Sequence, residues 1–297
     1  MRGKPDLPQD YFLHHFNFLI ENFKSVYGQS FCADTWGWAH RFSDLSVFEQ
    51  RFLLRAYSRK PRVYWLSEFN YSDIPDPERV FESLSSNGWL RQPMGLEVYD
   101  CLECANKSDL CRWLTMAFIP HKPSMKKAAL LKLAYSLPFA SLQEIVSKGG
   151  PFVLEHRGQF DLLSFLFFGS VRSGLQKFAL RDLGIMKTRK RANSEIGRPR
   201  FSSSAVATFE MSARSDYEFL KMKSDDYVKV FAEHKVLPKI PDGISEGAGE
   251  SFNKLVLLVS KNKLIDDRVA EEWLSQATAA PARMSWVRWL HRKGCAD

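Results

Sequence analysis

Apolar residues recur at spacings of three and four in several parts of the chain, and this period predicts amphipathic helices. Residues 10–27 are the first such segment, with phenylalanine, leucine and isoleucine on one face. Residues 47–60 are the second, where Ser46 stands at the expected N-cap position and Pro61 ends the pattern. In this second helix the arginines lie on or near the face opposite the apolar stripe, so one side is predicted to pack and the other to meet solvent.

A short β-prone stretch, VYWLSEF, separates the second helix from the next one. That helix opens at the Asp-Pro pair 76–77 and closes at the Asn-Gly pair 87–88, because glycine suits the left-handed backbone of a helix end. A short extended segment follows. Helix, helix, turn and short strand in this order match a winged helix-turn-helix in outline, so we expect a winged-helix-like module in residues 1–100.

Two further helices flank a proline-bearing connection in residues 107–136. KSDLCRWLTMAF and KKAALLKLAYS are the two helical patterns, and Pro120 and Pro123 force the intervening IPHKPSMK into an extended form. Leucines of both helices can face one another, and lysines gather at the connection and on the second helix. A helix N-terminus with several lysines suits a phosphate backbone, whereas a plain helical hairpin with solvated lysines is the alternative.

Segment 158–186 is strongly apolar, and its predicted core positions are Phe160, Leu163, Phe167 and Phe168. Its GSVRSG stretch is not a phosphate loop, because GxxxxGK[ST] occurs nowhere in the chain. The stretch that follows, KTRKRANSEIGRPR, holds six lysines and arginines against one glutamate. This basic loop is predicted to be exposed and to contact nucleic acid; the alternative is that it only keeps the protein soluble.

Helical patterns return in residues 201–297, with a loop at VLPKIPDGISEGAG. FNKLVLLVSKNK and DRVAEEWLSQAT are predicted to pair as antiparallel helices, and a further helix begins near Pro281. Such pairs predict an array of α-hairpins that resembles tetratricopeptide repeats and is truncated after the last helix. Trp286 and Trp289 share one face of that helix, and Met284 and Val287 broaden the apolar surface around it. We expect part of this surface to stay open and to mediate self-association, or docking of a separate nuclease domain, through residues 281–297.

Charge is distributed unevenly along this chain of 297 residues and 34.2 kDa. The formal net charge is +8, and residues 101–200 alone hold 17 lysines and arginines against 7 acidic residues, a surplus of +10. Residues 1–100 carry −2, and residues 201–297 are balanced. A local positive field is what a polyanion binder needs, because each neutralised phosphate releases counterions. The middle third is therefore predicted to bind a polyanion, whereas charge that only keeps the protein soluble is the alternative. The acidic balance of residues 1–100 argues against the winged-helix-like module as the main DNA contact.

Cysteine positions give no disulfide pattern. Five cysteines, an odd number over this length, do not make a disulfide framework, and a reduced cytoplasmic protein is expected. Cys101 and Cys104 form a CxxC, with Cys111 and His121 downstream, so a zinc site, a redox pair and ordinary core packing are the three interpretations, and core packing is favoured for Cys111. No apolar run approaches transmembrane length, and the N-terminus lacks the apolar core of a signal peptide, so neither a membrane partner nor secretion is expected.

Several of these stretches carry a family resemblance. It begins at YFLHHFNFLIENF, continues through SVFEQRFLLRAYSRKPRVYWLSEFNYSDI, and is most specific in QFDLLSFLFFGSVRSGLQKFALRDLGI. These stretches look like the N-terminal half of the bacterial Fanconi-associated nuclease family. The pair at 107–136 corresponds to the family's SAP-like helix-extended-helix element, and EEWLSQATAAPARMSWVRWLHRKG is similar to its helical repeats. The implied fold is mainly α, with the winged-helix-like module at 1–100, the SAP-like element at 101–150, an apolar connector with the basic loop at 151–200, and repeats at 201–297.

The resemblance also implies a function, namely binding of branched or flapped DNA through phosphate contacts during interstrand cross-link repair in the bacterial cytoplasm and nucleoid. Family members continue into a virus-type replication-repair nuclease domain, whose metal site uses a Pro-Asp step followed by Glu-x-Lys. Here Pro241-Asp242 is present but no Glu-x-Lys follows it, so no catalytic residue is carried over and no cleavage by this chain alone is expected. We expect no cofactor here, and Mg²⁺ or Mn²⁺ only with a nuclease domain.

The predicted phosphate contacts are the basic residues of the SAP-like element and of the basic loop. They are Lys107, Arg112, Lys122, Lys126, Lys127, Lys132, Lys187, Arg189, Lys190, Arg191, Arg198 and Arg200. Two other functions remain open. The chain can be the DNA-targeting subunit of a split nuclease whose catalytic domain is a separate partner, or it can be a helical scaffold that binds proteins.

Overall fold

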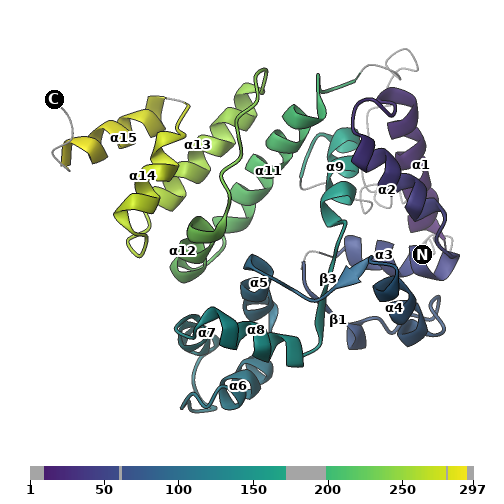
Figure 1. The fold of residues 1–297 in the computed structure, drawn as a ribbon, viewed down its shortest axis with the longest axis horizontal. Helices are drawn as coiled ribbons and strands as arrows, with labels where there is room; N and C mark the ends of the chain where they lie inside the picture. Colours follow the sequence, from purple (N-terminus) through teal and green to yellow (C-terminus); the bar gives the residue numbers. More distant parts are fainter. Residues whose placement is uncertain (1–9, 60–61, 172–198, 279, 293–297) are drawn as a thin grey trace, which may run out of the picture.

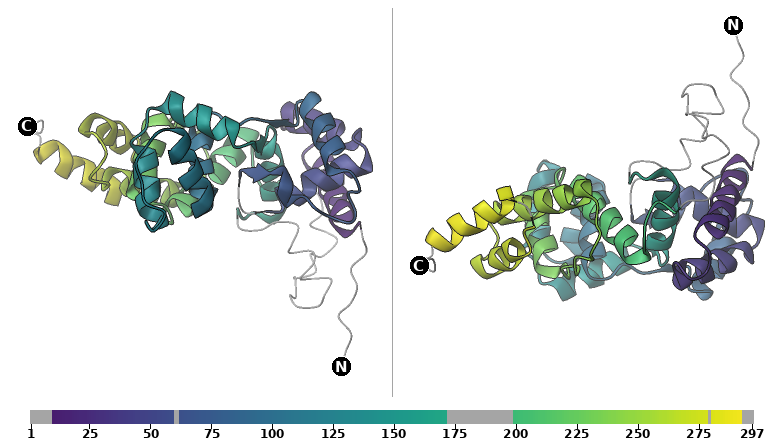
Figure 2. Two further views of the ribbon diagram at one scale, coloured as in Figure 1. Left: turned by 90° about the horizontal axis from the view of Figure 1, so that it is seen from below. Right: turned by 90° about the horizontal axis from the view of Figure 1, so that it is seen from above.

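The computed structural model describes residues 10–59, 62–171, 199–278 and 280–292, and most of them are helical (Figure 1). The mainly α fold predicted from the sequence is therefore confirmed. Figure 2 shows an elongated molecule, with the N-terminal helices at one end and the last helix at the other. No helix within these ranges is long and apolar enough to cross a membrane.

The first module is built on four helices, and the signals predicted at residues 46 and 76 start the last two of them. The helices are α1 (Tyr11–Val26), α2 (Ala33–Ser43), α3 (Val47–Tyr57) and α4 (Pro77–Ser86). A capping box starts α3: the Ser46 hydroxyl accepts from the backbone N–H of Glu49, and the Glu49 carboxylate accepts from the backbone N–H of Ser46 at 2.8 Å. Asp76 caps α4 by accepting from the backbone N–H of Arg79 at 3.1 Å. Local chemistry thus fixes both helix starts.

A small antiparallel sheet joins two distant parts of the chain. Its strands are β1 (Tyr64–Trp65), β2 (Leu90–Arg91) and β3 (Pro151–Leu154), in the order β1-β3-β2, and a short 3-10 turn, η1 (Leu66–Glu68), follows β1. Tyr64 lies opposite Phe152, and Leu90 lies opposite Leu154. The sheet of the winged-helix-like module is therefore completed by residues from the segment that begins at 151. The four domain boundaries predicted from the sequence stay predictions.

The strongly apolar segment forms α9 (Arg157–Phe168), which packs against α1 and α2. Phe160 and Leu163 are buried there as predicted, and Phe160 stacks on Tyr57 with ring centroids 4.2 Å apart. Phe167 and Phe168 are half-buried against the same core. The first core therefore combines the N-terminal helices with α9, which returns to them after four intervening helices.

A second core joins the middle of the chain to its C-terminal part. It contains α5 (Leu96–Cys104), α6 (Lys107–Met116), α7 (Lys127–Tyr135), α8 (Phe139–Lys148), α11 (Ser204–Leu220), α12 (Asp225–His234), α13 (Glu246–Ser260) and α14 (Asp267–Ser275). Trp273 is almost completely buried in it, and its indole N–H donates to the backbone oxygen of Ala232 at 3.2 Å. The helix pair at 107–136 packs on α5 and α8, and α5 in turn packs on α12.

The last helix, α15 (Ala280–Arg292), packs on α13 and α14, which also pack on each other as the sequence predicts. Trp286 and Trp289 are half-buried against the second core. Met284 and Val287 remain 50% and 49% exposed. The open apolar surface of this helix is therefore formed by Met284 and Val287, whereas the face that carries the two tryptophans packs on the second core instead of staying open.

Candidate nucleic-acid interface

Helices α6 and α7 pack against each other through leucines, as the sequence predicts. Leu110 and Leu114 of α6 and Leu130 of α7 are buried. Residues 117–126 connect the two helices without forming another helix or strand. Two packed helices with a non-helical connection that contains turns are thus present, and their outer surface carries the cations described next.

Five of the predicted cations on this element are exposed, and a sixth is not. The exposed ones are Lys107, Arg112, Lys122, Lys126 and Lys132. Arg112 forms an ion pair with Asp109 of its own helix, 3.0 Å between nitrogen and oxygen, yet 57% of its side chain stays exposed. Lys127 is half-buried, and its ammonium donates to the backbone oxygen of Glu103 at 2.8 Å. The structure brings these cations onto one element but holds Lys127 toward the interior.

The N-termini of the two helices differ in what they offer an anion. In α6 the side-chain oxygen of Asn106 accepts from the backbone N–H of Asp109 at 2.9 Å, and Asp109 adds a negative charge to the first turn. In α7 the N-cap residue is Lys126, with no side-chain cap and no acidic residue in the first turn. The positive end of a helix attracts anions, so α7 is the helix start suited to a phosphate.

Behind α7, two acidic residues one turn apart on α5 hold three elements together. Glu103 accepts from the Tyr135 hydroxyl at 2.8 Å and lies 3.5 Å from the ammonium of Lys223. Asp100 accepts from the Tyr227 hydroxyl at 2.5 Å. Burial raises the pKa of Asp100, although the Tyr227 hydrogen bond opposes that shift. This polar cluster of Asp100, Glu103 and their partners fixes α7 against α12. It was not predicted from the sequence, where the only signal for it was a pair of acidic residues three positions apart.

The arginines of α3 are paired within their own module. Arg51 forms an ion pair with Asp10 at 2.5 Å, and Arg55 forms one with the buried Asp73 at 3.1 Å. Arg59 pairs with Glu68 at 2.7 Å. Their positive charges are therefore neutralised locally, in agreement with the acidic balance of the first hundred residues.

Most of the predicted basic loop lies outside the described residues. Lys187, Arg189, Lys190, Arg191 and Arg198 belong to that part.

Arg200 is the one predicted contact of the basic loop that the structure describes. It is exposed, and its backbone N–H donates to the Tyr27 hydroxyl at 3.1 Å. Together with Arg214 it lines a groove of about 490 Å³ between α9 and α11. Arg200, one of the predicted phosphate contacts, therefore lines a groove next to the first core and lies away from α6 and α7 in the fold.

The cysteines and acidic groups do not assemble a metal site within the described ranges, where no group of three or more His, Cys, Asp and Glu side chains is arranged to hold an ion. Burial raises the pKa of the Cys101 thiol and that of the Cys104 thiol. Asp242 is exposed in a turn, and Glu250 forms an ion pair with Lys254 at 2.6 Å on α13. These residues do not fit the nuclease metal, so we derive no metal-dependent step for them.

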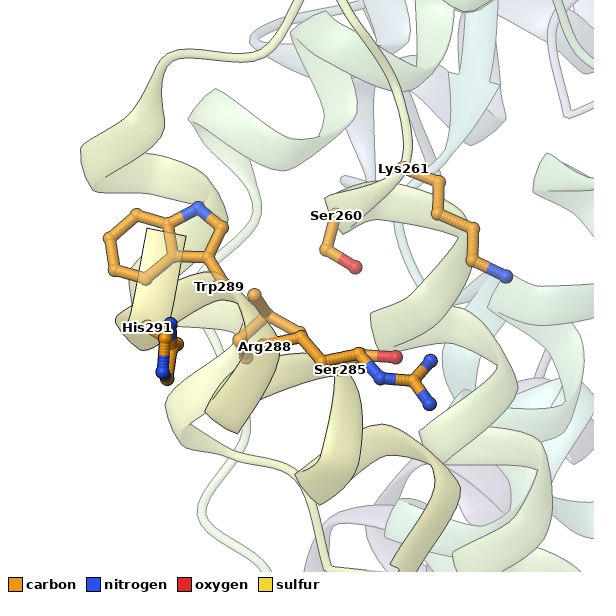
Figure 3. A pocket seen from close by; sticks show the side chains of 7 residues that line it. Ser260, Lys261, Ser285, Arg288, Trp289 and His291 are labelled. Carbon is orange, nitrogen blue, oxygen red and sulfur yellow. The ribbon is translucent and has the colours of Figure 1, made fainter. Parts of the chain in front are cut away.

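A second cationic surface lies at the far end of the molecule, in a groove of about 540 Å³ beside α15. Figure 3 shows Lys261 and Arg288 extending to one side of this groove and Trp289 standing at the other. Ser260 lies between them, and the described lining includes no acidic side chain. This groove was not predicted from the sequence, because Lys261 and Arg288 meet only when α15 folds onto the end of α13.

The fold and its basic helix pair define a class: a helical protein with a winged helix-turn-helix module and a lysine-rich helix pair. Residues 10–91 match the family model described as "FAN1, HTH domain". The chain is 24% identical over 193 residues to the "Fanconi-associated nuclease 1 homolog" of Pseudomonas aeruginosa, a match that covers 62% of this chain and 34% of that protein. The resemblance to the Fanconi-associated nuclease family is therefore confirmed, and the match spans about a third of the curated relative.

Two solved structures share the fold. Two crystal structures of paFAN1, bound to gapped DNA with a 5′ flap of two nucleotides or of one, align with TM-scores of 0.64 and 0.65. Both are 20% identical to this chain in sequence, and the alignments cover 98% and 96% of it. They cover 53% and 52% of the paFAN1 chain, so this protein corresponds in fold to about half of that one.

Proposed function

We propose that this chain is the DNA-binding part of a structure-specific repair nuclease and that it contacts DNA phosphates through the SAP-like pair α6–α7. The observation that carries the proposal is the start of α7. Lys122 and Lys126 are exposed around a helix N-terminus that has neither a side-chain cap nor an acidic residue in its first turn. Cations beside such a helix end favour a phosphate oxygen, because the backbone N–H groups and the ammonium groups act on it together.

The relatives support the finer statements of the proposal. The curated relative is described as a nuclease, and paFAN1 was crystallised with gapped, flapped DNA. We therefore propose branched or flapped DNA as the ligand, interstrand cross-link repair as the process, and the bacterial cytoplasm and nucleoid as the location. The helices after residue 201 are proposed to act as tetratricopeptide-like repeats that hold the DNA-binding surface in place.

We further propose that this chain alone does not cleave DNA. The motive is that Pro241-Asp242 is not followed by Glu-x-Lys. Metal-dependent hydrolysis of a phosphodiester needs carboxylates that fix the ion and orient the attacking water. A nuclease domain with its Mg²⁺ or Mn²⁺ is proposed to act in concert with this chain, on a separate chain in the split-nuclease alternative.

Binding of a fluorescent duplex with a 5′ flap, followed by anisotropy over a series of salt concentrations, tests the proposal. Changing Lys122 and Lys126 to alanine is expected to weaken binding of all sequences alike. Each lost phosphate contact lowers the salt slope of log K by about 0.7 to 0.9. The matched control replaces Arg51 and Arg55, which are paired with Asp10 and Asp73, and leaves that slope unchanged.

A protein-interaction scaffold is the rival function, and the same titration separates the two. A scaffold binds flapped DNA no more tightly than any basic protein does, and the lysine variant keeps the wild-type salt slope. If the arginine pair instead controls the slope, the winged-helix-like module is the DNA contact and α6–α7 is not.

A further inference from the structure

One aromatic side chain in the connection between α6 and α7 stands almost entirely in solvent. Phe118 is 92% exposed, the largest exposed fraction among the large apolar side chains that the structure describes. It follows α6 directly and precedes the exposed Lys122 by four residues. A phenylalanine in this position contributes almost no buried apolar area to folding.

The backbone at Phe118 adds a second, independent observation. Its φ is 57°, and it is the one residue other than glycine with positive φ in the described ranges. Its N–H donates to the Thr115 oxygen at 3.0 Å, and the N–H of Ile119 donates to the Leu114 oxygen at 2.9 Å. This pair of bonds is the Schellman motif, in which the residue at positive φ is usually glycine. A bulky side chain there is strained.

A second Schellman motif in the same chain, at the end of α4, has glycine at the position of positive φ. At the end of α4, Gly88 has φ 72° and its N–H donates to the Ser85 oxygen at 3.1 Å. The N–H of Trp89 then donates to the Leu84 oxygen at 2.8 Å. The two helix ends are therefore equivalent in hydrogen bonding, and they differ in the residue at the strained position. At Gly88 the strain is avoided, whereas at Phe118 it is retained without any gain from burial.

We propose that Phe118 is a base-stacking residue of the DNA interface. Its ring is inferred to stack on the base face left uncovered at an end, gap or flap junction, while the cations around Lys122 and Lys126 hold the neighbouring phosphates. This inference rests on the proposed function, since it names the feature of DNA that the α6–α7 surface selects. Strained residues gather at sites where function requires the side chain, and aromatic rings stack on bases without regard to sequence.

The charge around Phe118 favours DNA over an apolar protein partner. The connection and the start of α7 present Lys122 and Lys126, both exposed, with no acidic residue in the first turn of α7. Inside intact duplex DNA each base face is covered by its neighbour, so stacking on the ring requires a kink that costs unstacking energy. At an interruption one face is already open, and this cost is absent.

A substitution to glycine separates a binding role from a structural one, because the two roles predict opposite signs. Phe118→Gly relieves the backbone strain and is expected to raise Tm by about 2–4 °C. The same variant is expected to bind gapped or flapped duplex about tenfold more weakly, the loss typical of one stacked base. Its affinity for a long intact duplex, judged at concentrations where ends contribute little, is expected to stay at the wild-type value.

Two further variants keep the test falsifiable. Phe118→Leu retains the strained backbone and an apolar side chain but has no aromatic face, so it should show the same loss on flapped DNA without the gain in Tm. Met222, 80% exposed in the turn before α12, is the matched control, and Met222→Ala should change neither affinity nor Tm. A 2-aminopurine placed at the junction should lose fluorescence on binding the wild type and keep it with the leucine variant.

Equal binding of flapped DNA by the wild type, the glycine variant and the leucine variant overturns the inference. A lower Tm for Phe118→Gly also overturns it, because the side chain would then stabilise the fold. Failure of the proposed function looks different. In that case the wild type binds no DNA in a manner that depends on Lys122 and Lys126, whatever residue occupies position 118.

Discussion

The ammonium of Lys127 lies 2.8 Å from the backbone carbonyl oxygen of Glu103, whereas the adjacent Lys126 is exposed at the N-cap of α7. Two neighbouring lysines of one basic cluster therefore have different partners. Lys127 ties α7 to α5, and Lys126 is available to a phosphate.

Single substitutions of these two lysines are expected to act on different quantities. Lys126→Ala should lower the salt slope of DNA binding by about 0.7 to 0.9 and leave the free energy of unfolding nearly unchanged. Lys127→Ala should lower the free energy of unfolding by about 1 kcal/mol, because the Glu103 oxygen loses its donor. Anisotropy titrations and urea unfolding measure the two effects. A larger salt-slope change for Lys127→Ala than for Lys126→Ala would show that Lys127 leaves Glu103 to contact DNA.

Arg55 of α3 is expected to matter for stability rather than for DNA. Its guanidinium pairs with Asp73, which is only 6% exposed, and lies 4.7 Å from the ring centre of Tyr71. Arg55→Ala leaves the carboxylate of Asp73 without that partner and should cost about 1–3 kcal/mol of unfolding free energy. The salt slope of DNA binding should stay at the wild-type value. Arg79→Ala, at an exposed position on α4, is the comparison and should change stability by less than about 0.5 kcal/mol.

Glu49 is expected to make the stability of the first module depend on pH. Burial opposes its ionisation, but hydrogen bonds from Ser46 and Ser83 outweigh burial and hold its pKa below the ordinary value of 4.5. Above pH 4.5 the unfolded chain is ionised as well, so the stabilisation is fully present; it is lost as the pH falls through the folded pKa.

Glu49→Gln should therefore be less stable than the wild type by about 1 kcal/mol near pH 7, and the difference should shrink at about pH 3. Urea unfolding at both pH values measures this. A constant difference at both pH values would mean that Glu49 stabilises α3 without regard to its charge.

We propose that the exposed side of α15 mediates self-association. Met284 and Val287 are 50% and 49% exposed on this helix. Changing both to glutamate should lower the oligomeric mass measured by light scattering, because charge opposes burial of that surface. Lys263→Glu, an exposed position before α14, is the control and should keep the wild-type mass. A monomeric wild type contradicts the prediction, as does an oligomer that survives the double change.

The sequence predicted best those features that depend on neighbouring residues. The N-cap at Ser46, the start of α4 at Asp76 and the glycine stop at Gly88 all rest on contacts within a few residues of one another. The leucine seam between α6 and α7 follows from helical spacing alone. The burial of Phe160 and Leu163 was also predictable, because a strongly apolar segment usually packs into a hydrophobic core.

Features that depend on distant pairing were missed. Strand β3 has four buried apolar residues, and a run this short does not distinguish a strand from a helix or a connector. Its partners lie far away in the chain, in β1 and β2. Helix α2 was also missed, since its ADTWGWAHRFS has a glycine inside and a weak apolar period. The polar cluster at Glu103 depends on tertiary contacts, and the strain at Phe118 is seen in its backbone angle, so neither could be predicted from the sequence.

The central position of β3 has a consequence for synthesis of the chain. Among the described residues, both edge strands pair with β3 and with no other strand, so neither has a strand partner when it leaves the ribosome. Helices α5 to α8 emerge from the ribosome before Leu154 does, so the sheet of the first module lacks its central strand during that interval. Stalled translation before residue 151 should therefore yield a nascent chain whose first module is sensitive to protease. A chain released after the first turns of α11 should be protected, because the sheet, α9 and the buried Val206 and Ala207 then close the module together.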